Sequence, residues 1–248
     1  MLILGGTGEA LALARLLAQQ RPCLAVTTSL AGVTGSPVTP PGRLRSGGFG
    51  GAEGLAAWLT DERVDLLVDA THPFAATMAG HAAAAAARAD VPRLKLVRPM
   101  WPRQEDDRWI MAEDASAAAA VLAGLGARRV FLTLGTRELA AFGGLGDTAF
   151  TVRMIEAPAE PLPIAGARLL LARGPYDAAA EEVLMREHGF DALVTKASGG
   201  AATRGKIDAA RALSLPVVMI ARPPLPPGEH VADIDAALAW ITARLERI

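Results

Sequence analysis

The residues with the most evident chemistry begin the chain, in the segment Leu2-Ile3-Leu4-Gly5-Gly6-Thr7-Gly8-Glu9-Ala10. A short apolar run enters a glycine-rich loop, and leucines at helical spacing follow from Leu11 to Leu17. Such a strand–loop–helix unit directs backbone N–H groups and the positive end of the helix dipole toward a phosphate. Glycine lets a pyrophosphate approach the backbone closely. We therefore predict a dinucleotide site at Gly5, Gly6, Thr7, Gly8, Glu9 and Ala10.

The match to the dinucleotide fingerprint G-x-G-x-x-G/A is incomplete. Gly5 and Ala10 fit its two ends, but Thr7 stands where the middle glycine belongs. The alternative interpretation is a tight strand-to-helix turn that binds nothing. The position of the segment at the first strand of the chain favours the dinucleotide site.

The second expected strand indicates which dinucleotide is bound. An NAD site usually has an acidic residue near the end of this strand, where it binds the ribose hydroxyls. Here the strand ends Val26-Thr27-Thr28-Ser29-Leu30, without a carboxylate. Thr28 and Ser29, with Arg43 or Arg45 from the following loop, can instead bind a 2′-phosphate, although either arginine could equally be a solvated surface charge. The missing carboxylate favours NADPH as the cofactor.

A third polar segment, Asp69-Ala70-Thr71-His72-Pro73, follows the apolar strand expected at Asp65–Asp69. Loops at the carboxyl ends of parallel strands form the ligand crevice of open α/β sheets. The segment is similar to the Asp-x-Thr-x-Pro turn of dihydrodipicolinate-type reductases, which lies beside the nicotinamide ribose. This resemblance implies cofactor contacts from Ala70 and Thr71. His72 is the candidate catalytic residue, since imidazole exchanges protons near neutral pH; alternatively, it caps the turn.

Two polar segments in the second half also follow expected strands and precede expected helices. Arg173-Gly174-Pro175-Tyr176 follows one strand, and Lys196-Ala197-Ser198-Gly199-Gly200 follows another. Convergent cations, hydroxyls and backbone amides suit the binding of carboxylates. The alternative is a turn without a ligand and with solvated cations. We predict a substrate site made of Arg173, Tyr176, Lys196, Ser198, Gly199, Gly200, Thr203 and Lys206.

Short apolar strands alternate with alanine-rich helical segments along the whole chain. This alternation predicts an α/β protein with βαβ units and mostly parallel sheets. The expected strands are Leu2–Leu4, Leu24–Thr28, Asp65–Asp69, Leu94–Val97, Arg129–Leu134, Thr151–Ile155, Arg168–Leu171, Ala192–Thr195 and Val217–Ile220. The expected helices are Glu9–Gln20, Gly51–Glu62, Ala75–Ala89, Ala115–Gly124, Tyr176–His188, Lys206–Leu213 and Asp233–Glu246.

Nine strands are many for one open sheet, and the proline-punctuated segment 98–103 offers a boundary. We therefore expect two Rossmann-like domains with an interdomain cleft. Residues 1–100 would form the dinucleotide-binding domain and residues 101–248 the substrate-binding domain. The final helix could pack on either of them.

Composition excludes several other classes of protein. The chain has 248 residues, with 25 Lys+Arg against 26 Asp+Glu and a net charge of −1, so it lacks the basic excess of a nucleic-acid binder. Its single cysteine, Cys23, and four scattered histidines give no disulfide framework and no metal-ligand spacing. The start lacks a secretory signal, and the alanine run Ala82–Ala87 is too short to cross a bilayer. We expect a cytoplasmic protein with no membrane, nucleic-acid or metal partner; the oligomeric state is not indicated.

Taken together, these segments resemble the precorrin-6A reductase family of cobalamin (vitamin B12) biosynthesis. The resemblance is collinear and spans nearly the whole chain, and three positions depart from the family pattern: Val33, Tyr176 and Ala197 stand where arginine, phenylalanine and asparagine are usual. It is carried by LILGGTGEA at 2–10, GGFGG at 47–51, DATHPFA at 69–75, RPMW at 98–101, RGPY at 173–176, VTKASGG at 194–200, KIDAAR at 206–211 and LPVVMIARP at 215–223.

The resemblance implies hydride transfer from NADPH to a ring double bond of precorrin-6A, which gives precorrin-6B. The substrate would be a large, flat tetrapyrrole with many carboxylates. A proton must also be delivered, and His72, Tyr176, Lys196 and water are all candidates. Two alternatives stay open: the cobalt-precorrin-6A reductase of the anaerobic route, in which any cobalt arrives with the substrate, and a non-catalytic NADPH-binding regulatory module.

Overall fold

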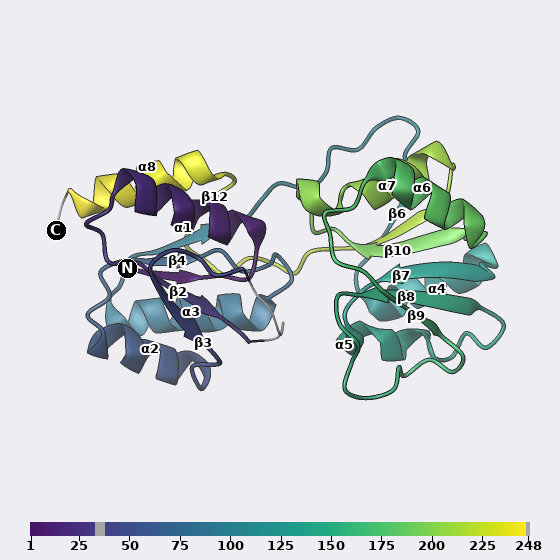
Figure 1. Cartoon of the computed structure of the whole chain (residues 1–248). Helices are drawn as coiled ribbons and strands as arrows, with labels where there is room; N and C mark the ends of the chain where they lie inside the picture. The colour runs from purple at the N-terminus through teal and green to yellow at the C-terminus, as the bar shows by residue number, and fades with distance from the viewer. Residues whose placement is uncertain (33–37, 247–248) are drawn as a thin grey trace. The chain divides into compact units, whose positions relative to one another are not determined.

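The structure is a computed structural model that describes residues 1–32 and 38–246. Val33, one of the positions that depart from the family pattern, lies outside the described residues. The chain forms two compact units (Figure 1). The first contains Met1–Pro99 and Pro223–Ile248, and the second contains Met100–Arg222.

The first unit is a parallel sheet covered by helices on both faces. Its strand order is β12-β5-β4-β1-β2-β3, and every pairing is parallel. The core on one face joins Ile3 and Val68 to leucines of α1 and to α8, and the core on the other face joins Leu2 and Leu67 to α2 and α3. The elements are β1 (Leu2–Leu4), α1 (Gly8–Gln20), β2 (Thr27–Leu30), β3 (Arg43–Ser46), α2 (Gly51–Asp61), β4 (Leu67–Asp69), α3 (Ala76–Ala89), β5 (Arg93–Leu96), β12 (Glu229–Val231) and α8 (Ile234–Leu245).

The second unit repeats this architecture with another parallel sheet, in the order β6-β11-β10-β7-β8-β9. Its strands are β6 (Trp109–Ala112), β7 (Arg129–Thr133), β8 (Ala149–Met154), β9 (Arg168–Leu171), β10 (Ala192–Lys196) and β11 (Val217–Ile220). Its helices are α4 (Ala115–Leu125), α5 (Thr136–Leu139), α6 (Ala178–Glu187) and α7 (Gly205–Ala212), with 3-10 turns at Ala140–Phe142 and Ala201–Thr203. Two six-stranded parallel sheets with flanking helices confirm the expected Rossmann-like α/β class.

Each sheet has a point at which the chain reverses its direction of strand addition. In the first sheet β2 and β3 lie on one side of β1, whereas β4, β5 and β12 lie on the other. In the second sheet β8 and β9 lie on one side of β7, and β10 and β11 lie on the other. Ligands of open α/β sheets bind at the carboxyl ends of the strands at such a switch point. The candidate ligand sites are therefore the carboxyl ends of β1 and β4 in the first unit and of β7 and β10 in the second.

All nine expected strands overlap strands of the structure, and the described residues contain three more. The additional strands are β3, β6 and β12, and each lies at an edge of its sheet. An edge strand packs against one neighbour, so it needs less apolar sequence than a central strand. β3 reads Arg-Leu-Arg-Ser and β12 reads Glu-His-Val, which is why hydrophobic patterning did not predict these two strands. β6 reads Trp-Ile-Met-Ala and carried an apolar signal that was missed.

The expected grouping of residues 101–248 into one domain is wrong at its C-terminal end. The chain leaves the first unit after Pro99 and returns to it at Pro223. The last helix places Ala237 and Ile241, both with no exposed surface, in the same core as Leu13 and Leu17 of α1. An apolar stripe on a terminal helix does not specify which sheet it covers, so the sequence left this choice open.

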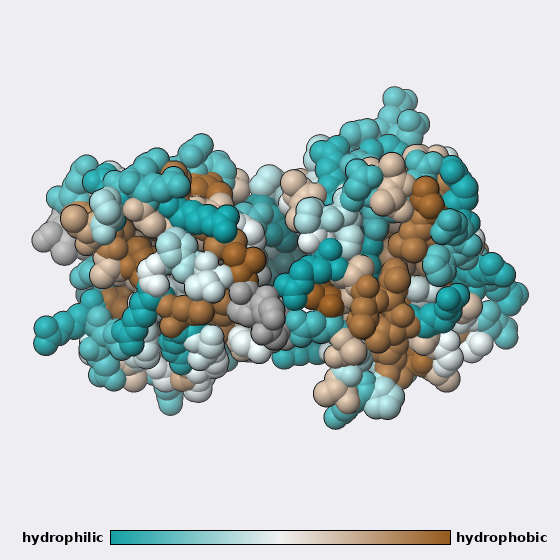
Figure 2. Space-filling view, viewed as in Figure 1, coloured by the Kyte–Doolittle hydropathy of each residue, from teal (hydrophilic) through white to brown (hydrophobic). Residues whose placement is uncertain are grey.

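The surface is more polar than these cores. Polar side chains dominate much of the viewed surface, and apolar side chains also gather on the viewed face of the second unit (Figure 2). Exposed apolar residues of that unit include Ile155, Leu169 and Leu171, at or near the edge strand β9. Among the described residues, no helix is both long and apolar enough to cross a bilayer.

Candidate functional site

The glycine loop after β1 lies at the first switch point, and its glycines have different roles. The Gly5 N–H donates to the Ser29 carbonyl at 2.8 Å. A Cβ on Gly5 would lie 3.0 Å from Thr28 Cγ2 and 3.1 Å from Leu30 Cδ2, so this glycine allows β1 and β2 to pack closely. Gly6 has φ +100°, a conformation that favours glycine, and a Cβ there or on Gly8 would meet nothing within 4 Å. The space in front of the helix is therefore open.

Thr7, which replaces the middle glycine of the fingerprint, is the N-cap of α1. Its Oγ1 accepts a hydrogen bond from the Ala10 N–H at 3.1 Å and donates one to the Ala70 carbonyl at 2.7 Å. The second bond joins the loop after β1 to the turn after β4, across the switch point. The N–H groups of Gly8 and Glu9, in the first turn of α1, have no intrahelical acceptor and can bind an anion.

A small pocket opens beside this loop. Within it, Glu9 forms an ion pair with Arg98 at 2.8 Å, and both side chains are largely buried. The cation offsets a carboxylate that would otherwise oppose an anionic ligand at the helix start. The pocket is lined by Thr7, Glu9, Ala70, Thr71, Pro73, Leu96 and Arg98.

The end of β2 separates the two candidate arginines. Ser29 is paired in register with Arg45, and Arg45 Nη1 donates to Ser29 Oγ at 3.3 Å. The Arg45 guanidinium also donates to the carbonyls of Gly47 and Gly48 and lies 3.6 Å from the centroid of the Phe49 ring. This network fixes a guanidinium next to the Ser29 hydroxyl.

Arg43 is held elsewhere, two residues nearer the amino end of β3. Its guanidinium forms a bidentate pair with Glu62, at 2.5 and 3.2 Å, and this pairing raises its pKa. The structure thus places Arg45, and not Arg43, beside Ser29. Thr28 is buried, and its Oγ1 has no hydrogen-bond partner among the described residues.

A buried polar cluster lies at the ends of β4 and β5. Lys95 Nζ is 3.0 Å from Asp69 Oδ1, and the two side chains are 3% and 0% exposed. Lys95 also donates to the carbonyl and the hydroxyl of Thr71, each at 3.1 Å. Burial lowers the pKa of Lys95, and the Asp69 carboxylate opposes this shift.

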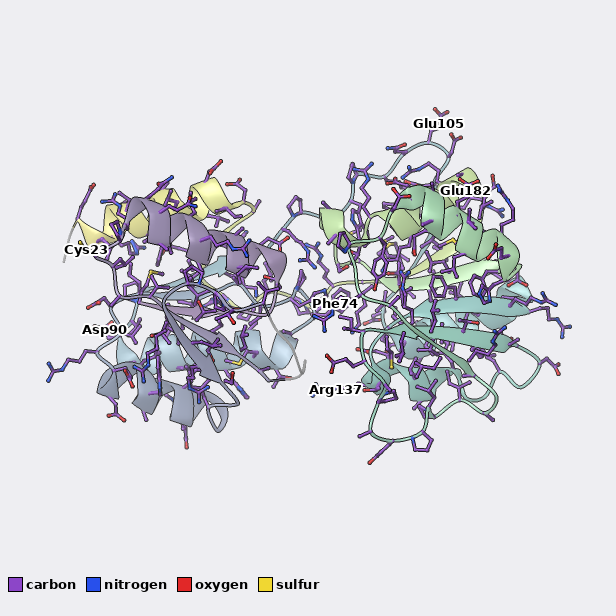
Figure 3. The ribbon with its side chains drawn as sticks, viewed as in Figure 1. Cys23, Phe74, Asp90, Glu105, Arg137 and Glu182 are labelled. Carbon is purple, nitrogen blue, oxygen red and sulfur yellow. The ribbon has the colours of Figure 1, made fainter. Side chains whose placement is uncertain are left out.

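One role of His72 is visible in its hydrogen bonding. Its Nδ1 accepts a hydrogen bond from the Phe74 N–H at 3.2 Å, so the ring caps the turn that leads to α3. In a neutral ring the proton is therefore on Nε2. Figure 3 shows Phe74 at the carboxyl edge of the first sheet, whereas Cys23 and Asp90 lie at the opposite edge. His72 follows Asp69, the last residue of β4, by three positions, as expected of a site residue, and its catalytic role stays a prediction.

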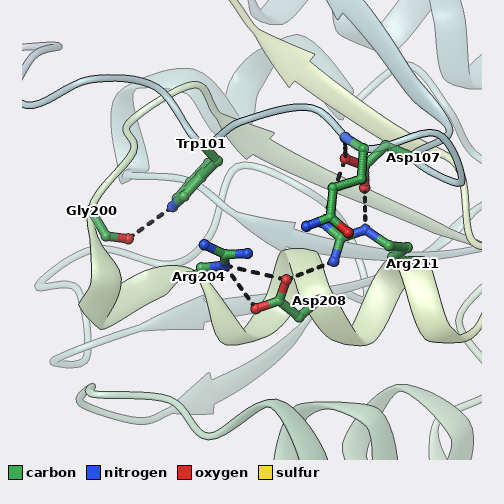
Figure 4. Close-up of polar contacts among 7 residues, drawn as sticks. Trp101, Asp107, Gly200, Arg204, Asp208 and Arg211 are labelled. Carbon is green, nitrogen blue, oxygen red and sulfur yellow. Dashed lines mark hydrogen bonds and ion pairs between the residues drawn. The ribbon is translucent and has the colours of Figure 1, made fainter.

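The second switch point gathers most of the predicted substrate residues. Lys196, the last residue of β10, pairs with Glu138 of α5 at 2.6 Å. Gly199 and Gly200 adopt φ values of +65° and +86°, and the Gly200 carbonyl accepts a hydrogen bond from Trp101 Nε1 at 2.8 Å (Figure 4). Arg222 donates to the carbonyls of Ala197 and Ser198, and Thr203 Oγ1 lies 3.5 Å from the Gly199 carbonyl. Hydrogen bonds from side chains of three other segments therefore hold this loop in place.

Lys206 is at this switch point but is not an exposed cation. Its side chain is buried, and Nζ donates to Thr133 Oγ1 at the end of β7, at 3.0 Å. Burial lowers the pKa of Lys206 to about 7; Arg153 adds to the shift and Glu181 opposes it. The buried Lys206 ammonium therefore loses its proton at a lower pH than an exposed lysine does.

Tyr176 lies beside a second buried ion pair, Arg153–Glu181, at 2.5 Å. The Arg153 guanidinium lies 3.8 Å from the centroid of the Tyr176 ring, and the Tyr176 hydroxyl donates to the Ala172 carbonyl. Burial raises the pKa of Tyr176, so its phenol is protonated near neutral pH. Arg173 is half exposed and pairs with Glu156.

Sequence reasoning missed several residues that the fold brings to these two places. They are Lys95 and Arg98 in the first unit and Thr133, Glu138 and Arg153 in the second. Lys95 carried a usable signal, because a single charge between Leu94 and Leu96 in an expected buried strand requires a partner. The described residues contain no cluster of His, Cys, Asp or Glu that could hold a metal ion.

Comparison with known proteins gives the family. The family model for precorrin-6x reductase CbiJ/CobK matches residues 1–242. The chain belongs to the precorrin-6x reductase family. The resemblance found in the sequence motifs is thus confirmed.

Relatives in the family are similar over nearly their full length. A precorrin-6A reductase from Rhodococcus erythropolis is 50% identical, over 97% of this chain and 96% of the relative. The Mycobacterium tuberculosis precorrin-6A reductase is 46% identical over the same shares. A solved structure named CobK precorrin-6A reductase matches with a TM-score of 0.92 and 40% identity, over 98% of this chain and 96% of that one. The two-unit fold is therefore that of the precorrin-6x reductase family.

Proposed function

We propose that this chain is an oxidoreductase that reduces precorrin-6A to precorrin-6B with NADPH in cobalamin biosynthesis. The observation that carries the proposal is membership of the precorrin-6x reductase family over residues 1–242, and the presence of candidate site residues at the switch points of both sheets supports it. When bound, NADPH supplies a hydride to one carbon of a ring double bond, and a proton completes the reduction at the other carbon.

The first unit fits the cofactor. Open space in front of Gly6 and Gly8 and the unpaired N–H groups at the start of α1 suit a pyrophosphate. Ser29 near the end of β2 and Arg45 beside it in β3 suit a 2′-phosphate. The absence of a carboxylate at the end of β2 disfavours NADH. Ala70 and Thr71, joined to the glycine loop through Thr7, would lie along the nicotinamide half of the cofactor.

The second unit fits a polycarboxylate. Lys196, the amides of Gly199 and Gly200, and Arg173 would bind carboxylates of the tetrapyrrole. A carboxylate that replaces Glu138 at Lys196 would keep the lysine paired. The proton source is one of His72, Tyr176, Lys196 or water, and hydride transfer itself needs chiefly close orientation of the two reactants.

The metal-free substrate is favoured over its cobalt form. Identity to the precorrin-6A reductases of Rhodococcus erythropolis and Rhodobacter capsulatus is 50% and 40%. Identity to the cobalt-precorrin-6A reductase of Salmonella typhimurium is 26%. The higher identity supports an enzyme of the metal-free route.

The test is anaerobic mixing of the protein with NADPH and either metal-free or cobalt precorrin-6A. We expect oxidation of NADPH and a product heavier by one hydride and one proton, faster with the metal-free substrate. Faster reduction of the cobalt substrate would assign the anaerobic route. NADPH binding without reduction of either substrate would instead support the regulatory module.

A further inference from the structure

The buried ion pair of Asp69 and Lys95 is not explained by the stability of the sheet. Lys95 lies in β5 between Leu94 and Leu96, and both charged side chains are almost completely buried. Desolvation of two charges is costly, and replacing such a pair by apolar residues is often neutral or stabilising. A pair in this place therefore calls for a specific role.

Its hydrogen bonds converge on one residue, Thr71. Lys95 Nζ donates to the Thr71 carbonyl and hydroxyl, each at 3.1 Å. Asp69 Oδ1 accepts from the Thr71 hydroxyl at 2.7 Å and from the Thr71 N–H at 3.1 Å. Both backbone polar groups and the side chain of Thr71 are thereby fixed.

Thr71 is directly connected to the glycine loop. The preceding carbonyl, of Ala70, accepts the hydrogen bond from Thr7 Oγ1 at 2.7 Å, and Thr7 in turn caps α1 through the Ala10 N–H. A continuous set of contacts thus runs from Lys95 in β5 to the first turn of α1. It crosses the switch point at which we place the cofactor.

We propose that Asp69 and Lys95 are a positioning pair for the dinucleotide. By fixing Thr71, they set the position of the turn at residues 70–75 relative to the glycine loop. This role rests on the proposed function, because it presumes NADPH at the first switch point. Burial lowers the pKa of Lys95, and Asp69 is the neighbour that opposes this shift and favours the charged form.

The experiment compares two double variants that each remove a buried ion pair. Asp69→Asn with Lys95→Met removes the positioning pair without leaving a charge unpaired. Asp107→Asn with Arg211→Met is the control in the other unit: it removes the 2.9 Å pair between α7 and the loop before β6, and Asp208, which also contacts Arg211, keeps its pair with Arg204 (Figure 4). The measurements are urea unfolding, NADPH affinity by calorimetry, and the isotope effect with NADPH deuterated at the transferred position.

We expect the Asp69/Lys95 double variant to unfold at nearly the wild-type urea concentration and to bind NADPH about tenfold more weakly, because Thr71 loses the hydrogen bonds that fix it. Its isotope effect should be larger, because a loosely held cofactor slows the hydride step relative to the others. The control variant should keep wild-type affinity and isotope effect. Wild-type affinity in the Asp69/Lys95 double variant would overturn the proposal.

A second variant keeps the test decisive if the double variant does not fold. Thr71→Val leaves the ion pair intact and removes the hydroxyl that both charges contact. We expect a several-fold weaker affinity for NADPH in a folded protein; unchanged affinity overturns the positioning role. If the wild-type protein itself binds no NADPH, the proposed function fails as well, and this outcome is distinct from a failure confined to the variants.

Discussion

At the scale of single residues, neighbouring side chains of one type differ because their partners differ. Arg43 and Arg45 are two positions apart on one edge strand. Arg43 pairs with Glu62, whereas Arg45 donates a hydrogen bond to Ser29. Likewise Lys196 is partly exposed beside Glu138, whereas Lys206 is buried against Thr133. Partners in the fold, and not residue type, decide which cation can meet a ligand.

Arg45→Ala should weaken NADPH binding by about 1.5–3 kcal/mol, the value of a lost hydrogen bond to a charged group. NADH binding should change little, because NADH lacks the 2′-phosphate. Arg43→Ala is the matched control and should leave both affinities near wild type. Titration of each variant with both cofactors gives the answer, and an equal loss for NADH would remove Arg45 from the phosphate site.

Lys206 should make stability depend on pH. Its pKa is about 7 in the folded protein, against 10.5 for an ordinary lysine, so between these values the unfolded chain binds one more proton. The free energy of unfolding should therefore rise with pH in this window, by about 1.4 kcal/mol per pH unit from this group. Urea unfolding of wild type and Lys206→Met at several pH values isolates the contribution; parallel curves would contradict it.

At the scale of elements, the start of α1 is both a capped helix end and the predicted pyrophosphate site. Thr7 caps the helix, and Gly8, its first residue, faces open space. A carboxylate at this position stabilises a helix through its dipole. The same charge would repel a pyrophosphate, so stability and cofactor affinity can be separated here.

Gly8→Asp should raise the free energy of unfolding by about 0.3–1 kcal/mol and weaken NADPH binding strongly. Gly8→Asn is the neutral control of similar size, and its affinity should lie between those of Gly8→Asp and wild type. Thermal unfolding and calorimetry measure the two effects. Undiminished NADPH affinity in Gly8→Asp would place the pyrophosphate elsewhere.

At the scale of the whole molecule, each unit has its own switch point and its own set of candidate binding groups. The first unit offers helix amides and Arg45, which suit phosphates, and the second offers Lys196 and glycine amides, which suit carboxylates. The chain enters the second unit at Met100 and leaves it at Arg222. Variants in one unit should therefore affect one ligand.

Lys196→Ala should weaken tetrapyrrole binding by about tenfold, since a contact with a partly buried cation is lost. NADPH affinity should remain at the wild-type value. Arg186→Ala is the matched control, because this exposed residue forms an i,i+4 pair with Glu182 along α6 and such pairs contribute little. If NADPH affinity falls and tetrapyrrole affinity does not, the ligands are assigned to the wrong units.

The class of fold, the nine strands with clear apolar runs and the family could all be predicted from the sequence, because they depend on local patterns and collinear motifs. The placement of β12 and α8 in the first unit could not, since a short edge strand and an apolar stripe fit more than one sheet. The tertiary structure also shows that Arg45 faces Ser29 and that Lys95 fixes Thr71. Such pairings join residues distant in sequence, and they follow from the register of neighbouring strands, which a single sequence does not state.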